Sequence, residues 1–170
     1  PRLANQARKR LCADLHVAYG AAEASNVAGA PLAMLERHPG GVGFVSPGSE
    51  VQAVDADHQP LPPGTEGTIR VRSATCIGGY LGEKKASEQA FRDGWFYPGD
   101  VGAVTADGVL IISGRTGEMI NAGGVKVSPQ VIEDVILTNP DIADAAAFAM
   151  PDPTTGLPEI WVAVVQRKPV

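Results

Sequence analysis

Apolar residues between Gly43 and about Ser113 fall in short or alternating runs separated by turn residues, a pattern typical of β-strands. Val51–Val54 forms one such run. In residues 67–72, Ile69 and Val71 alternate with polar side chains, which predicts a strand with one buried face and one solvated face. Residues 101–104 and 109–112 flank an Asp107-Gly108 dipeptide, and this combination predicts a β-hairpin. This part of the chain is therefore expected to be rich in β-structure.

Helical patterns lie on either side of these strands and between them. Residues 3–15 are typical of a short polar helix that runs into a strand at residues 15–18, and residues 84–92 are compatible with a helix. Ser128 at an N-cap and Pro129 at the first helical position predict another helix start, after a short strand at residues 125–127. The helix has apolar residues at helical spacing and should end near residues 139–140: Val131, Ile132, Val135 and Ile136.

Further strands are expected at residues 144–150 and 160–165, so a β-α-β-β arrangement follows a boundary near Gly114. The fold class is α+β. The chain has 170 residues, of which 44% are hydrophobic and 19% charged, as in an ordinary globular protein. Because it begins at Pro1 in what resembles the middle of an element, we expect a fragment of a longer protein.

Charge and cysteine content narrow the classes of partner. A net charge of −5 gives no basic footprint for nucleic acid, and no apolar run approaches the roughly 18–20 residues of a membrane-spanning helix. Cys12 and Cys76 are far apart and outside any paired-ligand spacing, so neither a disulfide framework nor a zinc site is suggested.

Residues 19–23, Tyr-Gly-Ala-Ala-Glu, combine groups that would suit a nucleotide. An aromatic ring, a glycine that permits close backbone approach and a carboxylate could together bind a purine nucleotide with Mg²⁺. A packed Tyr19 and a surface Glu23 would explain the same residues without a ligand. Asp100 and Arg115 flank the expected hairpin, so they should lie near each other and hold a ribose or form a structural salt bridge. Residues 123–126, Gly-Gly-Val-Lys, are first interpreted as a turn.

The order of these segments resembles the adenylate-forming superfamily, which includes acyl-CoA synthetases such as fatty-acid–CoA ligases. Residues 19–24 are similar to its Tyr-Gly-x-Thr-Glu motif. Residues 79–100 run from Gly-Tyr to Gly-Trp-Phe-Tyr-Pro-Gly-Asp and are similar to a second family motif, Gly-Tyr…Gly-Trp…Thr-Gly-Asp. Residues 114–133 resemble its long Gly-Arg…Ile…Gly…Val-x-Pro-x-x-Ile-Glu signature. The resemblance implies that residues 1–113 end the large N-terminal AMP-binding domain, with a β-barrel-like subdomain from about residue 42. Residues 114–118 would be a hinge, and residues 119–170 the truncated start of a small mobile lid domain.

The resemblance also implies roles for single residues. Tyr19 would stack on adenine beside Gly20, Glu23 would help to hold Mg²⁺, Asp100 would bind the ribose hydroxyls, and Arg115 would bind ribose or phosphate. The resemblance implies that Gly123, Gly124 and Lys126 bind CoA and that Gly117 lies at the hinge.

The activity implied is that of an AMP-forming acyl-CoA synthetase, an acid–thiol ligase that uses ATP, Mg²⁺ and CoA. A carboxylate attacks ATP to give an acyl-adenylate and pyrophosphate, and a thiol then displaces AMP. The catalytic lysine is expected beyond Val170, so the isolated fragment should be inactive. Loading of a carrier protein and a degenerate binding module of the same family stay open as alternatives. Fatty-acid metabolism and a cytoplasmic location are expected, whereas the acid and the oligomeric state cannot be read from these residues.

Three positions depart from the family pattern. Ala22 replaces a threonine whose hydroxyl would donate to a phosphate, and Pro98 replaces a threonine before Gly-Asp. Gly117 stands where the family usually has Asp or Lys at the hinge, which predicts a more flexible lid. These departures motivate the degenerate-module alternative.

Overall fold

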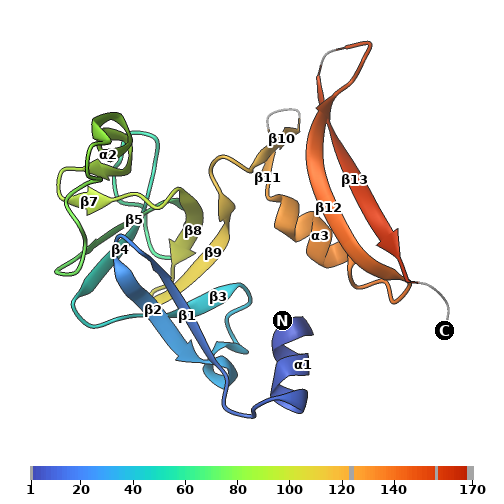
Figure 1. The fold of residues 1–170 in the computed structure, drawn as a ribbon, viewed down its shortest axis with the longest axis horizontal. Coiled ribbons are helices and arrows are strands. Elements are labelled where there is room, and N and C mark those ends of the chain that lie inside the picture. Colours follow the sequence, from blue (N-terminus) through green and yellow to red (C-terminus); the bar gives the residue numbers. More distant parts are fainter. Residues whose placement is uncertain (1, 123–124, 156, 168–170) are drawn as a thin grey trace. The chain divides into compact units, whose positions relative to one another are not determined.

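The structure, a computed structural model, describes residues 2–122, 125–155 and 157–167 (Figure 1). The chain divides into two compact units, Pro1–Ile112 and Ser113–Val170. Sheet-rich units with few helices make the fold α+β, as the sequence predicts.

The first unit begins with helix α1 (Arg2–Arg10) and is built on one sheet. Its strands are β1 (His16–Ala21), β2 (Ser25–Pro31), β3 (Gly41–Val45), β4 (Ser49–Val54), β5 (Gly67–Ser73), β6 (Phe91–Arg92), β7 (Trp95–Phe96), β8 (Asp100–Val104) and β9 (Val109–Arg115). The order within the described residues is β1-β2-β3-β9-β8-β5-β7-β6, with β4 also paired to β5. A 3₁₀ helix, η1 (Leu32–Leu35), follows β2, and helix α2 (Lys84–Ala90) precedes β6.

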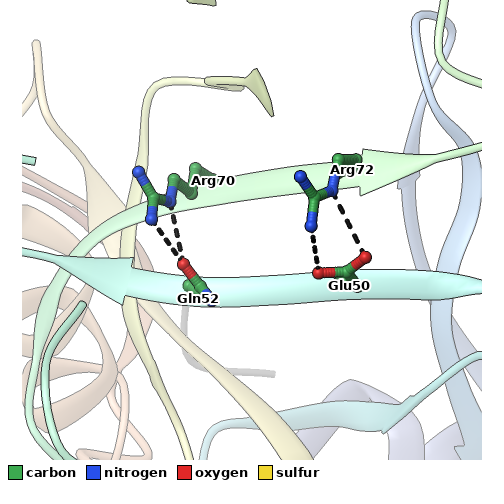
Figure 2. A network of polar contacts seen from close by, with 4 residues as sticks. All are labelled: Glu50, Gln52, Arg70 and Arg72. Atoms are coloured by element: carbon green, nitrogen blue, oxygen red, sulfur yellow. Dashed lines mark hydrogen bonds and ion pairs between the residues drawn. The ribbon is translucent and has the colours of Figure 1, made fainter. Parts of the chain in front are cut away.

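Strand β5 shows the alternation expected from residues 67–72. Ile69 and Val71 are 0% and 1% exposed and form part of the core. Arg70 and Arg72 lie on the opposite face, where the register places them across from β4 (Figure 2). The Arg70 Nη2 donates to Gln52 Oε1 at 2.6 Å, and the two arginine side chains lie parallel in the figure.

Trp95 of β7 lies against the two arginines on this face of β5. The guanidinium carbons of Arg70 and Arg72 each lie 4.4 Å from the ring centre of Trp95, which is 7% exposed. A cation over an aromatic face is attracted to the ring by its quadrupole. The two guanidinium groups therefore lie over the indole of Trp95, and their N–H groups donate to Gln52 and Glu50 of β4.

The hairpin of β8 and β9 confirms the prediction made from Asp107-Gly108. The Thr105 N–H donates to the Val109 carbonyl at 2.9 Å, which closes the turn. Gly108 has a φ of +81°, a conformation that glycine adopts at no steric cost.

Several boundaries differ from the sequence prediction, and β2 was not anticipated. Helix α1 ends at Arg10 rather than near residue 15, and α2 ends at Ala90 rather than residue 92. The second difference has a clear cause, because Phe91 and Arg92 pair with β7 and the Phe91 ring packs 5.1 Å from that of Phe96. Aromatic packing and strand pairing there override the local helix preference.

The second unit contains the short hairpin β10 (Ile120–Ala122) and β11 (Val125–Val127), helix α3 (Pro129–Ile136), and the long hairpin β12 (Ile142–Pro151) and β13 (Pro158–Gln166) (Figure 1). Ser128 is the N-cap of α3, but its side chain makes no capping hydrogen bond. The helix ends at Ile136, before residues 139–140. Val131 and Val135, expected on its apolar face, are 55% and 66% exposed.

Candidate functional site

Tyr19 and Asp100, which belong to different sequence motifs, meet across the sheet. Tyr19 lies in β1 and its hydroxyl donates to Asp100 Oδ2, on the first residue of β8. Asp100 is 5% exposed, whereas Tyr19 is half-buried. A buried carboxylate needs such donors, because its desolvation is costly when no hydrogen bond compensates. The two side chains thus form one polar unit in which Asp100 is buried and Tyr19 is half-buried.

Glu23 of the first motif is likewise bound by a tyrosine of the second. The Tyr80 hydroxyl donates to Glu23 Oε1 at 2.7 Å. This hydrogen bond raises the pKa of Tyr80 above its usual value of 10.0, with further contributions from burial and from the glutamate charge. Tyr80 was not among the candidate residues, although the Gly79-Tyr80 pair that begins the second motif was a signal that could have found it.

The loop that carries Tyr80 is anchored to the turn between β1 and β2. The Ile77 N–H donates to the Glu23 carbonyl at 2.9 Å, and the Thr75 hydroxyl donates to the Ala24 carbonyl at 3.0 Å. The first motif and the loop after β5 are therefore held together by backbone as well as side-chain contacts.

The geometry of the β1–β2 hairpin requires a glycine at position 20. A Cβ at this position would lie 2.1 Å from the Ser25 carbonyl oxygen, at a register irregularity between Tyr19 and Gly20. Real Cβ atoms do not approach backbone so closely, so the β1–β2 hairpin itself requires glycine here.

Asp100 and Arg115, the two residues that flank the predicted hairpin, lie at the ends of paired strands. Asp100 begins β8 and Arg115 ends the neighbouring β9, and they belong to the first and second compact units respectively. Arg115 is exposed, and its carbonyl accepts the Glu118 N–H at 3.0 Å in the turn that follows. Gly117 is exposed in this turn, and a Cβ there would meet no atom within 4 Å.

The residues expected near CoA are only partly described. Gly123 and Gly124 lie outside the described residues. Lys126 lies in β11, opposite Asn121 in the register with β10.

The Glu23 carboxylate is of a kind that can bind Mg²⁺ together with the phosphates of a nucleotide. In the described part of the chain, no three His, Cys, Asp or Glu side chains gather as a metal site. Mg²⁺ is commonly held by one or two carboxylates together with substrate phosphates and water. A single carboxylate, that of Glu23, fits this pattern.

Comparisons with known proteins agree with the motifs. The family model described as "AMP-binding enzyme" matches residues 1–81. The chain is 36% identical over 170 residues to the probable CoA ligase CCL9 of Humulus lupulus, covering 99% of this chain and 32% of that protein. It is 35% identical over 153 residues to an oxalate–CoA ligase of Arabidopsis thaliana, covering 89% and 29%.

Solved structures give the same result. The amide bond synthetase McbA from Marinactinospora thermotolerans has a TM-score of 0.84 at 31% identity, covering 96% of this chain and 33% of that one. An o-succinylbenzoate CoA synthetase from Bacillus subtilis, in complex with ATP and magnesium ion, has a TM-score of 0.85 at 25% identity, covering 99% and 35%. The fold and the paired motifs therefore define an adenylate-forming type of protein.

This chain belongs to the adenylate-forming, AMP-binding superfamily. It spans about a third of the length of the curated relatives that it matches. Because the relatives include an oxalate–CoA ligase, membership does not support the expected role in fatty-acid metabolism. In the described residues, no helix combines the length and the apolar character needed to cross a membrane.

Proposed function

We propose that the complete protein activates a carboxylic acid with Mg·ATP and transfers the acyl group to the thiol of CoA. The observation that carries the proposal is the pairing of the two motifs through Tyr19–Asp100 and Glu23–Tyr80. Aromatic, acidic and metal-binding groups for one nucleotide thereby come from segments that are far apart in the sequence. The names of the relatives, which include CoA ligases, support the same reaction.

We assign the nucleotide contacts as follows. The ring of the half-buried Tyr19 stacks on adenine beside Gly20, while its hydroxyl stays hydrogen-bonded to Asp100. Asp100 accepts hydrogen bonds from the ribose hydroxyls, and Arg115 donates to ribose or phosphate. Glu23 helps to hold Mg²⁺, which when bound neutralises charge on the phosphates.

Acyl transfer is assigned to the second unit. Residues 114–118 form the hinge, with Gly117 as its pivot, between the end of the large domain (residues 1–113) and the beginning of the mobile domain (residues 119–170). Gly123 and Gly124 are proposed to bind CoA along its pantetheine arm, and Lys126 to contribute positive charge near its phosphates. The catalytic lysine is proposed to lie outside these 170 residues, which alone would not catalyse adenylation.

The test is pyrophosphate release by the complete protein with Mg·ATP and a panel of short, aromatic and fatty acids, with and without CoA. Asp100→Ala should raise the ATP concentration needed for the first step, and Asp134→Asn on α3 is the control. Gly124→Leu should block thioester formation and leave adenylate formation intact. Unchanged pyrophosphate release in Asp100→Ala would remove the ribose role.

The acceptor has a second candidate. The structural likeness to an amide bond synthetase, at 31% identity, favours testing an amine beside CoA. A carrier-protein thiol is a third acceptor in the same assay. Absence of pyrophosphate release with every acid, from a folded protein that binds ATP, would favour the degenerate module and point to Ala22, Pro98 and Gly117.

A further inference from the structure

Tyr80 contacts Glu23 from a loop that reaches it by a specific path. After β5, two hydrogen bonds fasten the loop to the β1–β2 turn, from Thr75 to Ala24 and from Ile77 to Glu23 itself. The chain then brings the Tyr80 hydroxyl to within 2.7 Å of Glu23 Oε1, 57 residues away in sequence. Both the backbone carbonyl and the side chain of Glu23 are therefore held by this loop.

Tyr80 is itself held by contacts with residues other than Glu23. Its N–H donates to Ser87 Oγ at 2.8 Å, in the middle of α2. Its ring meets the Phe91 ring edge-on, with 5.5 Å between centres. Gly79 makes room for this arrangement, because a Cβ there would lie 3.1 Å from Ser87 Oγ. A tyrosine locked by packing and hydrogen bonding can hold its partner in one orientation.

The hydrogen bond uses only one of the two carboxylate oxygens of Glu23. In the described part of the chain, Oε1 accepts from Tyr80, and no hydrogen bond or ion pair to Oε2 is found. A carboxylate with one oxygen held by a protein donor and the other oxygen available is a suitable single ligand for Mg²⁺.

We propose that Tyr80 is a positioning residue that orients Glu23 toward the Mg²⁺ of the bound nucleotide. This rests on the proposed function, in which Glu23 helps to hold that metal. Tyr80 does not touch the reacting atoms; it fixes the rotamer of the glutamate through its hydroxyl. Loss of the outer partner of a metal ligand typically lowers metal affinity 10–100-fold. For a half-buried pair we expect the low end, about tenfold.

The experiment measures metal binding directly. The complete protein is incubated with an α,β-methylene analogue of ATP and titrated with Mn²⁺, and free Mn²⁺ is followed by electron paramagnetic resonance. Tyr80→Phe, which deletes only the hydroxyl, should weaken Mn²⁺ binding about tenfold. Glu23→Gln should weaken it at least as much, and adding Tyr80→Phe to Glu23→Gln should have no further effect. Tyr97→Phe is the matched control, because Tyr97 is also half-buried and its hydroxyl has no hydrogen bond to other described residues.

The two proposals fail in different ways. If Glu23→Gln leaves Mn²⁺ affinity unchanged, the metal role of Glu23 in the proposed function is wrong, and the role of Tyr80 falls with it. If Glu23→Gln weakens Mn²⁺ binding but Tyr80→Phe does not, only the positioning role is wrong. The same holds if Tyr80→Phe weakens Mn²⁺ binding by the same factor whether or not Glu23→Gln is present. Should Tyr80→Phe not fold, Ser87→Ala removes the acceptor of the Tyr80 N–H and must weaken Mn²⁺ binding in the same non-additive way.

Discussion

The hydrogen bond between Tyr19 and Asp100 should be a measurable source of stability in the first unit. Tyr19→Phe removes the hydroxyl that donates to a carboxylate that is only 5% exposed. A hydrogen bond to a charged group contributes about 1.5–3 kcal/mol, so we take a loss of about 2 kcal/mol. The first unit has 112 residues. At about 2.1 cal/mol/K of unfolding entropy per residue, this loss lowers its Tm by about 8 °C.

The assay is differential scanning calorimetry of the 170-residue chain with two companion variants. Tyr97→Phe, whose ring packs against His58 and whose hydroxyl lacks a hydrogen bond to other described residues, should change the Tm little. In an Asp100→Asn background, Tyr19→Phe should cost about half as much, because hydrogen bonds between neutral groups are about half as strong. Equal Tm shifts for Tyr19→Phe and Tyr97→Phe would refute the reasoning.

Three other perturbations follow from the geometry. Gly20→Ala should destabilise the chain by about 2 kcal/mol or more, whereas Gly117→Ala, which meets open space, should stay within about 0.5 kcal/mol in urea unfolding. Glu50→Gln should cost less than about 1 kcal/mol, and the cost should vanish at 1 M salt, because the ion pair with Arg72 is exposed. Since the pKa of Tyr80 is raised, its contribution to stability is complete below about pH 10 and is lost as pH rises through the folded-state pKa. Melting curves from pH 8 to pH 11 should show this loss as a fall in Tm with rising pH. If the Tm of Tyr80→Phe falls with pH as steeply as that of the unmodified chain, the prediction is contradicted.

Local patterns were sufficient for much of the sheet. The alternation around Ile69 and Val71 located β5 because burial on one face imposes a period of two. Asp107-Gly108 located the hairpin because the turn needs a positive φ at the glycine. Both signals lie within a few residues of the structure that they determine.

The site depended on contacts that no local pattern contains. The motifs named Glu23 as a candidate, but its link to Tyr80 arises only when the loop after β5 folds back over the first hairpin. The sequence predicted Gly20 as a point of close ligand approach, and the close backbone contact with Ser25 is a second requirement for glycine that no local pattern contained. The end of α2 depended in the same way on Phe91 finding a partner in β7.

The burial of Trp95 beneath two guanidinium groups provides an optical probe for the first unit. The chain has two tryptophans, one in each compact unit, and Trp161 in β13 is 50% exposed while Trp95 is 7% exposed. Indole emission moves to longer wavelength as the ring enters water, so Trp161 already emits to the red in the folded chain. The spectral shift during denaturation therefore reports the opening of the β5–β7 face, and Trp161→Phe would leave that signal without background.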